Sequence, residues 1–335
     1  MNRREFLVVL GAAGCGAKAI PDRKRHHVFR DAGASEDAPV SISDDFQPQA
    51  QEYASPVIPI SSLFARRTQS ALVFVDATTL KPVASVAGAY GSTCAANASS
   101  LYALSHKPCQ VERFDGALFA TTMLVPGGCT SGDGARMVAA GNSLYLSSWD
   151  TLAVFAIAND QLTEAGRIQL DDSTRDTFQL VGLADGRLLI PGGKKLHVYH
   201  GATALEPLHA SAHLAHLASA GADRIWYSAY GEHGIDRVVL AKLEPGLPAI
   251  ATLETRIVHL ASAPDGAAVL TVDPTGWSIV VLDANGRERQ RIKLPAEFTQ
   301  FGLPSCFVAL SAKIVVLDAG TDGLFGWDIA TGARL

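Results

Sequence analysis

The feature that most constrains this chain is one short apolar pattern that recurs seven times at a spacing near forty residues. Each copy is a run of aliphatic or aromatic residues, and the copies lie at residues 71–76, 111–115, 152–156, 196–200, 238–241, 279–283 and 324–328. Their closing positions are separated by 39, 41, 44, 41, 42 and 45 residues. Short apolar runs bounded by turn residues are typical of β-strands, so the pattern predicts an equivalent strand in each of seven units.

A second mark recurs in phase with the first, about a dozen residues earlier in each unit. It is an apolar residue inside a short apolar stretch: Leu63, Leu101, Leu144, Leu188, Ile225, Ala268 and Ile314. Units of about forty residues with four short strands each are the repeat of a β-propeller. We therefore predict an all-β fold, a seven-bladed β-propeller over residues 55–335, with six or eight blades as alternatives.

The turns between the predicted strands agree with this fold. In two of these turns a carboxylate that can cap the turn precedes a glycine that can adopt positive φ: Asp283 precedes Gly286, and Asp328 precedes Gly332. Seven residues follow Asp328, fewer than a full outer strand needs. Because an unpaired sheet edge invites aggregation, we expect an early segment to complete the last blade. Residues 39–46 and 55–60 are the two alternatives, and we favour the second.

One segment, residues 202–222, is rich in Ala, Leu and His. A pair of strands is favoured there over a short helix. His209, His213 and His216 could line one face only if this segment were helical, so we read them as buried or surface histidines.

The first fourteen residues have the pattern of an export signal. Two arginines precede an apolar run of roughly eight residues, far shorter than a membrane-spanning helix. Residues 3–7, Arg-Arg-Glu-Phe-Leu, resemble the core of a twin-arginine translocation signal. That resemblance implies a protein exported after it has folded, with or without a cofactor.

Cys15 follows Ala12, Ala13 and Gly14, which resemble the site where bacterial lipoproteins are cleaved and acylated, with palmitate or a similar chain. Ala12 stands where that motif usually has leucine, so a plain signal peptide cleaved nearby is the alternative. Gly16 follows the cysteine, at the position where aspartate would indicate retention at the inner membrane. The resemblance therefore implies transport to the outer membrane. Residues 15–54 are polar and of mixed charge, and predict a lipidated cysteine with a disordered tether.

Charge and motifs together limit the partners. The formal net charge is −5, so the chain lacks the basic field that nucleic-acid binding needs. The repeat resembles bacterial YVTN-type and quinoprotein-like propellers, and Asp328 to Gly332 read Asp-Ile-Ala-Thr-Gly, similar to the turn of quinoprotein repeats. Linear signatures of hydrolases, zinc proteases and nucleotide-binding loops are missing from the sequence.

The loops that join the second and third strands of each blade share one face, and the most distinctive residues fall there. We predict a binding site from Arg66, His106, Trp149, Lys194, Tyr230, Glu232, His233, Asp273 and Trp277. Glu232 and His233 could form an acid/base pair or two metal ligands only if their loop bends, because adjacent residues of a strand point to opposite sides. We assign no metal site, and any cofactor stays unknown.

The cysteines after Cys15 are Cys94, Cys109, Cys129 and Cys306. In an exported protein an even number favours disulfides. We expect one bridge, with Cys109–Cys129 first and Cys94–Cys109 second.

Three functions fit these observations. The first is a lipid-anchored binding or scaffold module of the cell envelope, in the periplasm or at the cell surface, monomeric, with an envelope protein or a small molecule as partner. The second is a propeller enzyme, a lactonase or quinoprotein-like oxidoreductase, with its site at the mouth of the channel. The third is a passive surface-layer component.

Overall fold

The computed structural model describes residues 58–335 except 61, 68–70, 88–89, 98, 107–108, 116–117, 119, 129–136, 149, 171–179, 232–233, 264, 297, 299–306 and 320–322. Contacts divide the chain into two units, residues 1–45 and 46–335. The first unit, with the predicted signal, Cys15 and most of the tether, lies wholly outside the described residues. In the described part of the chain no helix is long and apolar enough to cross a bilayer.

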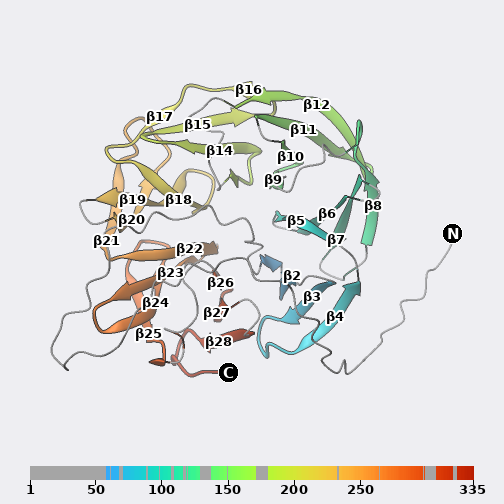
Figure 1. Ribbon diagram of the computed structural model, residues 1–335. Helices are drawn as coiled ribbons and strands as arrows, with labels where there is room; N and C mark the ends of the chain where they lie inside the picture. The colour runs from blue at the N-terminus through green and yellow to red at the C-terminus, as the bar shows by residue number, and fades with distance from the viewer. Residues whose placement is uncertain are drawn as a thin grey trace, which may run out of the picture. The chain divides into compact units, whose positions relative to one another are not determined.

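The described residues form seven antiparallel sheets, which follow one another around a ring (Figure 1). Blade 1 contains β1 (Ile58–Ile60), β2 (Leu63–Arg67), β3 (Ala71–Asp76) and β4 (Pro82–Ala87). Blade 2 contains β5 (Tyr90–Ala96), β6 (Ser100–His106), β7 (Cys109–Asp115) and β8 (Ala120–Leu124). Blade 3 contains β9 (Met137–Ala140), β10 (Ser143–Ser148), β11 (Thr151–Ala158) and β12 (Gln161–Gln169).

The remaining blades continue the same order. Blade 4 contains β13 (Val181–Gly182), β14 (Arg187–Gly192), β15 (Lys195–His200), β16 (Thr203–Ala204) and β17 (Leu208–His209). Blade 5 contains β18 (Leu214–Ser219), β19 (Arg224–Gly231), β20 (Gly234–Lys242) and β21 (Ala249–Glu254). Blade 6 contains β22 (Ile257–Ala263), β23 (Gly266–Asp273), β24 (Gly276–Asp283) and β25 (Glu288–Lys293), and blade 7 contains β26 (Phe307–Leu310), β27 (Ile314–Asp318) and β28 (Leu324–Asp328).

The seven-bladed propeller predicted from the repeat is confirmed. All seven closing runs lie in the third strand of a blade, and all seven marks of the second pattern lie in the second strand. The segment that follows residue 202 forms β16, β17 and β18, so the strand interpretation is confirmed over the helix. The strands of the structure therefore recur with the spacing of about forty residues from which the blades were predicted.

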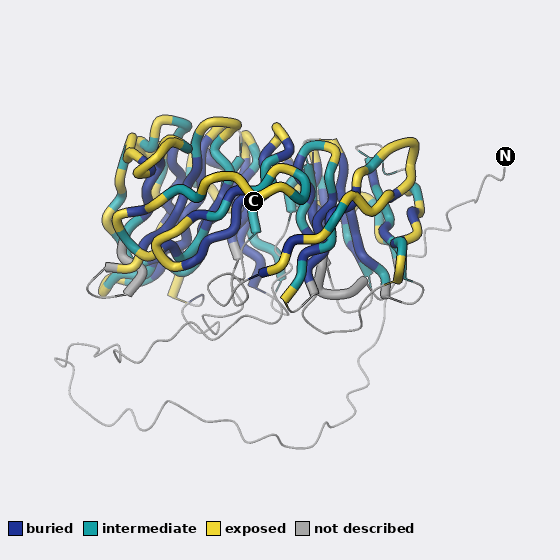
Figure 2. Tube along the Cα trace, turned by 90° about the horizontal axis from the view of Figure 1, so that it is seen from above, coloured by how far each residue is buried: buried dark blue, intermediate teal, exposed yellow. Residues whose placement is uncertain are grey.

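The core of the protein lies between the blades. The buried side chains form seven clusters, and each cluster joins one blade to the next. Figure 2 shows this distribution, with buried stretches along the strands and exposed residues at the turns. A single four-stranded sheet has no core of its own to fill, so burial of apolar surface stabilises adjacent blades rather than separate ones.

The ring closes differently from our expectation. Residues 58–60 form β1, which pairs with β2 as the innermost strand of blade 1, so the prediction that residues 55–60 complete blade 7 is wrong for this strand. The C-terminal residues instead turn back on β28: Trp327 and Arg334 form a β-bridge, and the Leu335 N–H donates to the Gly326 carbonyl at 2.9 Å. The other alternative, residues 39–46, lies outside the described residues.

Blades 1 and 7 meet through side chains, because no strand of the described residues is shared between them. Phe64 and Val75 of blade 1 pack with Ile314 and Val316 of blade 7. This junction has the same apolar character as the six junctions between consecutive blades. Within residues 58–335, as far as they are described, the two ends of the ring therefore meet by side-chain packing, with no strand exchanged between them.

Gly182 marks the tightest approach between two innermost strands. A Cβ atom at this position would overlap the backbone carbonyl of Ala139 on the neighbouring blade. We expect Gly182→Ala to lower the free energy of unfolding by about 2 kcal/mol, because backbone cannot move aside as a side-chain tip can. Chemical denaturation measures this loss. Gly182 does not have a positive φ, so backbone strain does not contribute, and a Gly182→Ala protein as stable as the wild type would contradict the steric argument.

Candidate functional site

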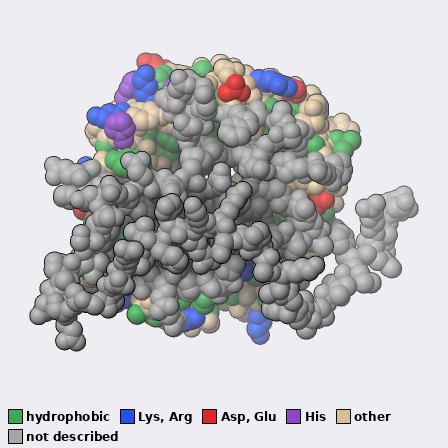
Figure 3. All heavy atoms as spheres, in the orientation of Figure 1, with side chains coloured by type: hydrophobic (Ala, Val, Ile, Leu, Met, Phe, Trp, Pro, Cys, Tyr) green, Lys and Arg blue, Asp and Glu red, His purple; other side chains and the backbone are tan. Residues whose placement is uncertain are grey.

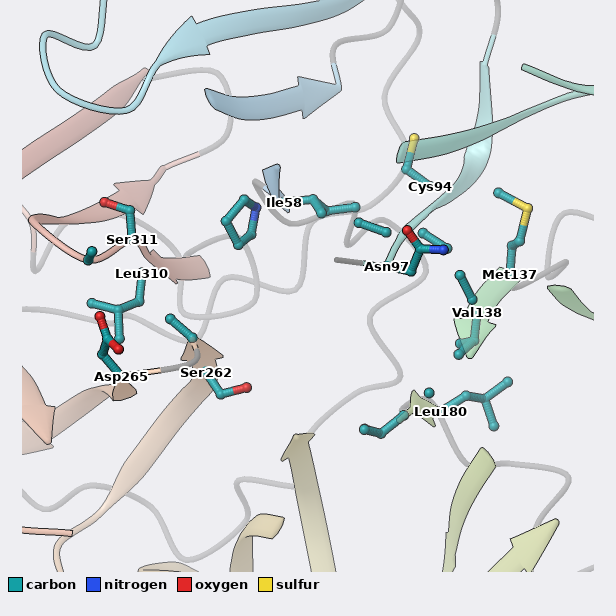
Figure 4. Close-up of a pocket in the computed structure, with 18 residues that line it drawn as sticks. Ile58, Cys94, Asn97, Met137, Val138, Leu180, Ser262, Asp265, Leu310 and Ser311 are labelled. Atoms are coloured by element: carbon teal, nitrogen blue, oxygen red, sulfur yellow. The ribbon is translucent and has the colours of Figure 1, made fainter. Parts of the chain in front are cut away.

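A cavity of about 670 Å³ lies at the centre of the ring and is the candidate functional site. Six of the seven blades contribute to its lining, which comprises Ile58, Pro59, Cys94, Ala95, Ala96, Asn97, Met137, Val138, Ala139, Leu180, Val181, Gly182, Ser262, Ala263, Asp265, Leu310, Ser311 and Ala312. Its volume is in the range of small-molecule sites. Figure 4 shows side chains from separate blades surrounding this space.

The cavity exists because the innermost strands carry small residues. Alanine or glycine occupies lining positions on β5, β9, β13 and β22. These strands are the closest to the ring axis, where large side chains facing inward would fill the space. The small residues that let the blades converge thus also keep the centre open.

Three polar lining residues occupy equivalent places in three blades. Asn97, Asp265 and Ser311 each lie in the turn from the innermost strand to the second strand. In an antiparallel sheet this turn is at the opposite end from the loop that joins the second and third strands. The polar part of the cavity therefore lies toward the face opposite to the one on which we predicted the site.

Asn97 holds its turn and joins two blades. Its Oδ1 accepts the N–H groups of Ser99 and Ser100 at 3.0 and 2.9 Å, and its Nδ2 donates to Tyr102 Oη and to the carbonyl of Gly141, each at 3.3 Å. All of these contacts are structural. Asn97 therefore fixes the shape of the cavity wall.

Asp265 is the only carboxylate among the described lining residues. It is exposed, and Figure 4 shows it beside Ser262 and Leu310 on the side of blades 6 and 7, across from Asn97 and Met137. One carboxylate on an otherwise small, largely apolar wall suits reversible binding of an apolar group with one donor or positive charge. Among the described residues, no group of three or more His, Cys, Asp or Glu side chains could hold a metal ion.

Two histidines lie on the innermost strands of blades 5 and 6. His216 of β18 has its Nδ1 2.8 Å from the hydroxyl of the fully buried Ser228, and His259 Nδ1 of β22 accepts the Val308 N–H at 3.3 Å. Their rings are edge to face, with centroids 6.4 Å apart. Burial lowers the pKa of His216 to about 4 and that of His259 to about 3, and for His259 the neighbouring His216 adds to the effect. Both imidazoles are therefore neutral near pH 7.

The predicted loop-face residues are distributed over several blades. Arg66 forms a bidentate contact with Asp318 of blade 7, with its Nη2 2.9 Å from Oδ1 and its Nε 3.1 Å from Oδ2. His106 ends β6 opposite Cys109. Trp149, Glu232 and His233 lie outside the described residues, so their roles stay predictions.

Two further candidates have structural roles. Asp273 caps its own turn, accepting the Thr275 hydroxyl at 2.6 Å and the Thr275 N–H at 2.7 Å, and these two bonds lower its pKa. Trp277 is 6% exposed and packs in the apolar cluster between blades 6 and 7. It is therefore a core residue rather than a surface contact.

Lys194 and Tyr230 are the predicted residues that the structure does bring together on one surface. Lys194 is exposed in the turn between β14 and β15, and Tyr230, 40% exposed, lies near the end of β19. They belong to neighbouring blades. Sequence reasoning found these two residues but missed Asn97, Asp265 and Ser311, whose signal was only a polar residue in a predicted turn.

The cysteine predictions have a partial outcome. Cys94 is a half-buried reduced thiol on the cavity wall, so the second pairing, Cys94–Cys109, is wrong. Cys129 lies outside the described residues, and the first pairing, Cys109–Cys129, stays a prediction.

Known proteins resemble this chain in fold. No family model and no curated protein matches the sequence. Among solved structures, a chain of the mitotic checkpoint complex aligns with 91% of this chain and 99% of its own length at a TM-score of 0.57 and 13% identity. Hsv2 of Kluyveromyces lactis aligns over 80% of this chain and 90% of its own, with a TM-score of 0.56 and 12% identity.

A bacterial surface protein is similar as well. PorZ, a component of the type-IX secretion system of Porphyromonas gingivalis, aligns over 83% of this chain and 37% of its own length, with a TM-score of 0.52 and 14% identity. At such identities the likeness shows the fold alone: this chain is a seven-bladed β-propeller.

Proposed function

We propose that this protein is an exported, lipid-anchored propeller that acts as a binding or scaffold module in the cell envelope. The observation that carries the proposal is the succession of Arg3, Arg4, Phe6 and Leu7, then Cys15, then a ring in which every blade packs on two others. A ring stabilised between its blades can vary its loops and channel without losing its core. That property suits recognition of a partner.

The structural neighbours add support of a general kind. PorZ is described as a bacterial surface component of a secretion system, and another neighbour is part of a multiprotein checkpoint complex. Propellers of this shape thus serve in assemblies. We assign the chain to the YVTN-type or quinoprotein-like group of bacterial propellers and place it in the periplasm or at the cell surface, with a Cys109–Cys129 bridge.

Binding is favoured over catalysis by the lining of the cavity. Among its described polar lining residues, Asn97 and Ser311 hold turns, Ser262 offers a hydroxyl, and Asp265 is an exposed carboxylate. Apolar lining with few polar groups provides affinity for a ligand and only limited acid/base capacity.

Replacement of the two arginines of the predicted signal tests whether the protein is exported by the twin-arginine pathway. In bacteria that have the twin-arginine pathway, Arg3→Lys with Arg4→Lys is expected to retain the full-length chain in the cytoplasm. Cys15→Ser is expected to abolish incorporation of labelled palmitate and to release the exported protein from the membrane fraction. Fractionation and metabolic labelling measure these outcomes.

A matched change outside both motifs, Arg23→Lys, provides the control and should leave export and labelling unchanged. Export of the double-lysine variant at the wild-type level would refute the twin-arginine route. Membrane retention of the Cys15→Ser protein would refute the lipid anchor and favour the plain signal peptide instead.

A further inference from the structure

The junction of blades 4 and 5 carries an exposed group of basic and aromatic side chains that the cavity does not use. We call it the blade 4–5 patch, and it consists of Lys194, Lys195, His209, His213 and Tyr230, all of them exposed. Figure 3 shows Lys or Arg and His side chains gathered on the rim of the ring where Figure 1 places β15 and β17.

Backbone pairing brings the patch residues together from three segments. Lys195 of β15 is the direct cross-strand partner of His209 in β17, so their side chains share one face of the sheet. The His213 ring lies close to Gly193, since a Cβ there would be 3.7 Å from its Nδ1. The Tyr230 N–H donates to the His213 carbonyl at 3.0 Å, which fixes β19 beside this segment.

The two lysines differ from five arginines of the described residues that form close ion pairs. Arg66, Arg113, Arg167, Arg187 and Arg291 each lie within 3 Å of a carboxylate oxygen. Within the described part of the chain Lys194 and Lys195 form no ion pair, and they extend from adjacent positions into solvent. A chain with a net charge of −5 therefore exposes a local concentration of positive charge here.

We propose that the blade 4–5 patch binds an acidic segment of a partner polypeptide, one in which Asp or Glu residues follow one another in an extended chain. The proposal rests on the proposed function as a binding module and names the chemistry of its partner. The carboxylates of such a segment would contact the lysines, while Tyr230 and the two imidazoles supply hydrogen bonds and apolar contact.

A single small anion fits this surface less well. Compact anion sites use several backbone N–H groups that point into a concave turn. Here the N–H groups of Ala210, Leu214 and Tyr230 already donate to backbone carbonyls, at 2.9, 2.8 and 3.0 Å. Side chains spread along strand ends therefore match spaced carboxylates better than one phosphate.

The test is a direct titration of the purified protein with a fluorescein-labelled oligoglutamate peptide, followed by anisotropy at low and near-physiological salt. The variant Lys194→Glu/Lys195→Glu is expected to bind about tenfold more weakly than the wild type, and added salt should weaken wild-type binding. Oligoglutamine of the same length should bind to neither protein.

A matched control is available on other blades. Lys81 and Lys313 are exposed lysines in turns between β3 and β4 and between β26 and β27, so Lys81→Glu/Lys313→Glu makes the same charge change at the other end of the blades. It should bind oligoglutamate within about twofold of the wild type. Equal weakening in both double variants, or undetectable binding by the wild type, would overturn the proposal.

Two further measurements establish which ligand chemistry the patch selects and whether the variants are folded. Inorganic phosphate or anionic phospholipid vesicles that displace the peptide at lower concentrations than oligoglutamate would overturn the proposal and assign the patch to a different ligand. Thermal unfolding confirms that both double variants are folded. Because export and lipid attachment are scored by fractionation, loss of the patch interaction leaves the proposed function testable on its own.

Discussion

Replacing Arg66 with methionine is expected to lower the free energy of unfolding by about 3 kcal/mol, because it leaves the Asp318 carboxylate buried without its cation. The side chain of Asp318 is 7% exposed and that of Arg66 21% exposed, and the guanidinium contacts both carboxylate oxygens. This ion pair joins blade 1 to blade 7. Chemical denaturation of the wild type and variant measures the difference.

Two comparisons isolate the buried charge as the cause. The double variant Arg66→Met/Asp318→Leu should recover most of the stability, since replacing both partners removes the stranded carboxylate. Arg291→Met breaks an exposed pair, with side-chain exposures of 41% and 39%, and should cost no more than about 1 kcal/mol. Equal losses in Arg66→Met and Arg291→Met would contradict the argument.

Lowering the pH from about 7 to about 5 is expected to reduce the free energy of unfolding by about 4 kcal/mol, with about 2 kcal/mol from each of His216 and His259. Their pKa values in the folded protein are about 4 and about 3, whereas histidine in an unfolded chain titrates near 6.5. The unfolded state therefore binds more protons throughout this window. Stability is complete above pH 6.5 and is lost as the pH falls toward the folded-state values.

The variant His216→Asn/His259→Asn tests the assignment, because asparagine offers an oxygen near the position of Nδ1 but does not titrate. Its unfolding free energy should change less between the two pH values than that of the wild type. The four turn carboxylates with lowered pKa, Asp76, Asp273, Asp283 and Asp328, titrate below this window. An unchanged pH slope in the double variant would show that the histidines are not responsible.

The sequence predicted the fold well because the physical signal was repeated. Each blade buries the same strand faces against its neighbours, so Leu63 and Leu101 recur in phase with the runs that close at Asp76 and Asp115. The closing segment that we favoured, residues 55–60, was predicted wrongly for β1, because ring closure occurs once and gives no repeated pattern in the sequence. A three-residue strand such as β1 has no internal sign of which neighbour it will join.

The candidate site was predicted less well for a related reason. Charged and aromatic residues in predicted loops are the sequence-based candidates for a binding site. In the structure Trp277 packs in the core and Arg66 joins two blades. The cavity lining includes alanines and turn residues such as Asn97, residue types that are common throughout the chain. These positions line one cavity only because the innermost strands of different blades come together at the ring axis. That arrangement depends on the assembled ring and has no local signal in the sequence.

The pairing pattern has a consequence for how the protein assembles. Every sheet in the described part of the chain consists of strands that are neighbours in sequence, so the strand pairings within a blade are local, whereas Arg66 and Asp318 are separated by 252 positions. Short sequence separations within a blade favour early formation of individual blades, and bringing the first and last blades together has the largest loop-closure entropy cost. The first-to-last contact is then a late step, and weakening it would accelerate unfolding while leaving the folding rate nearly unchanged.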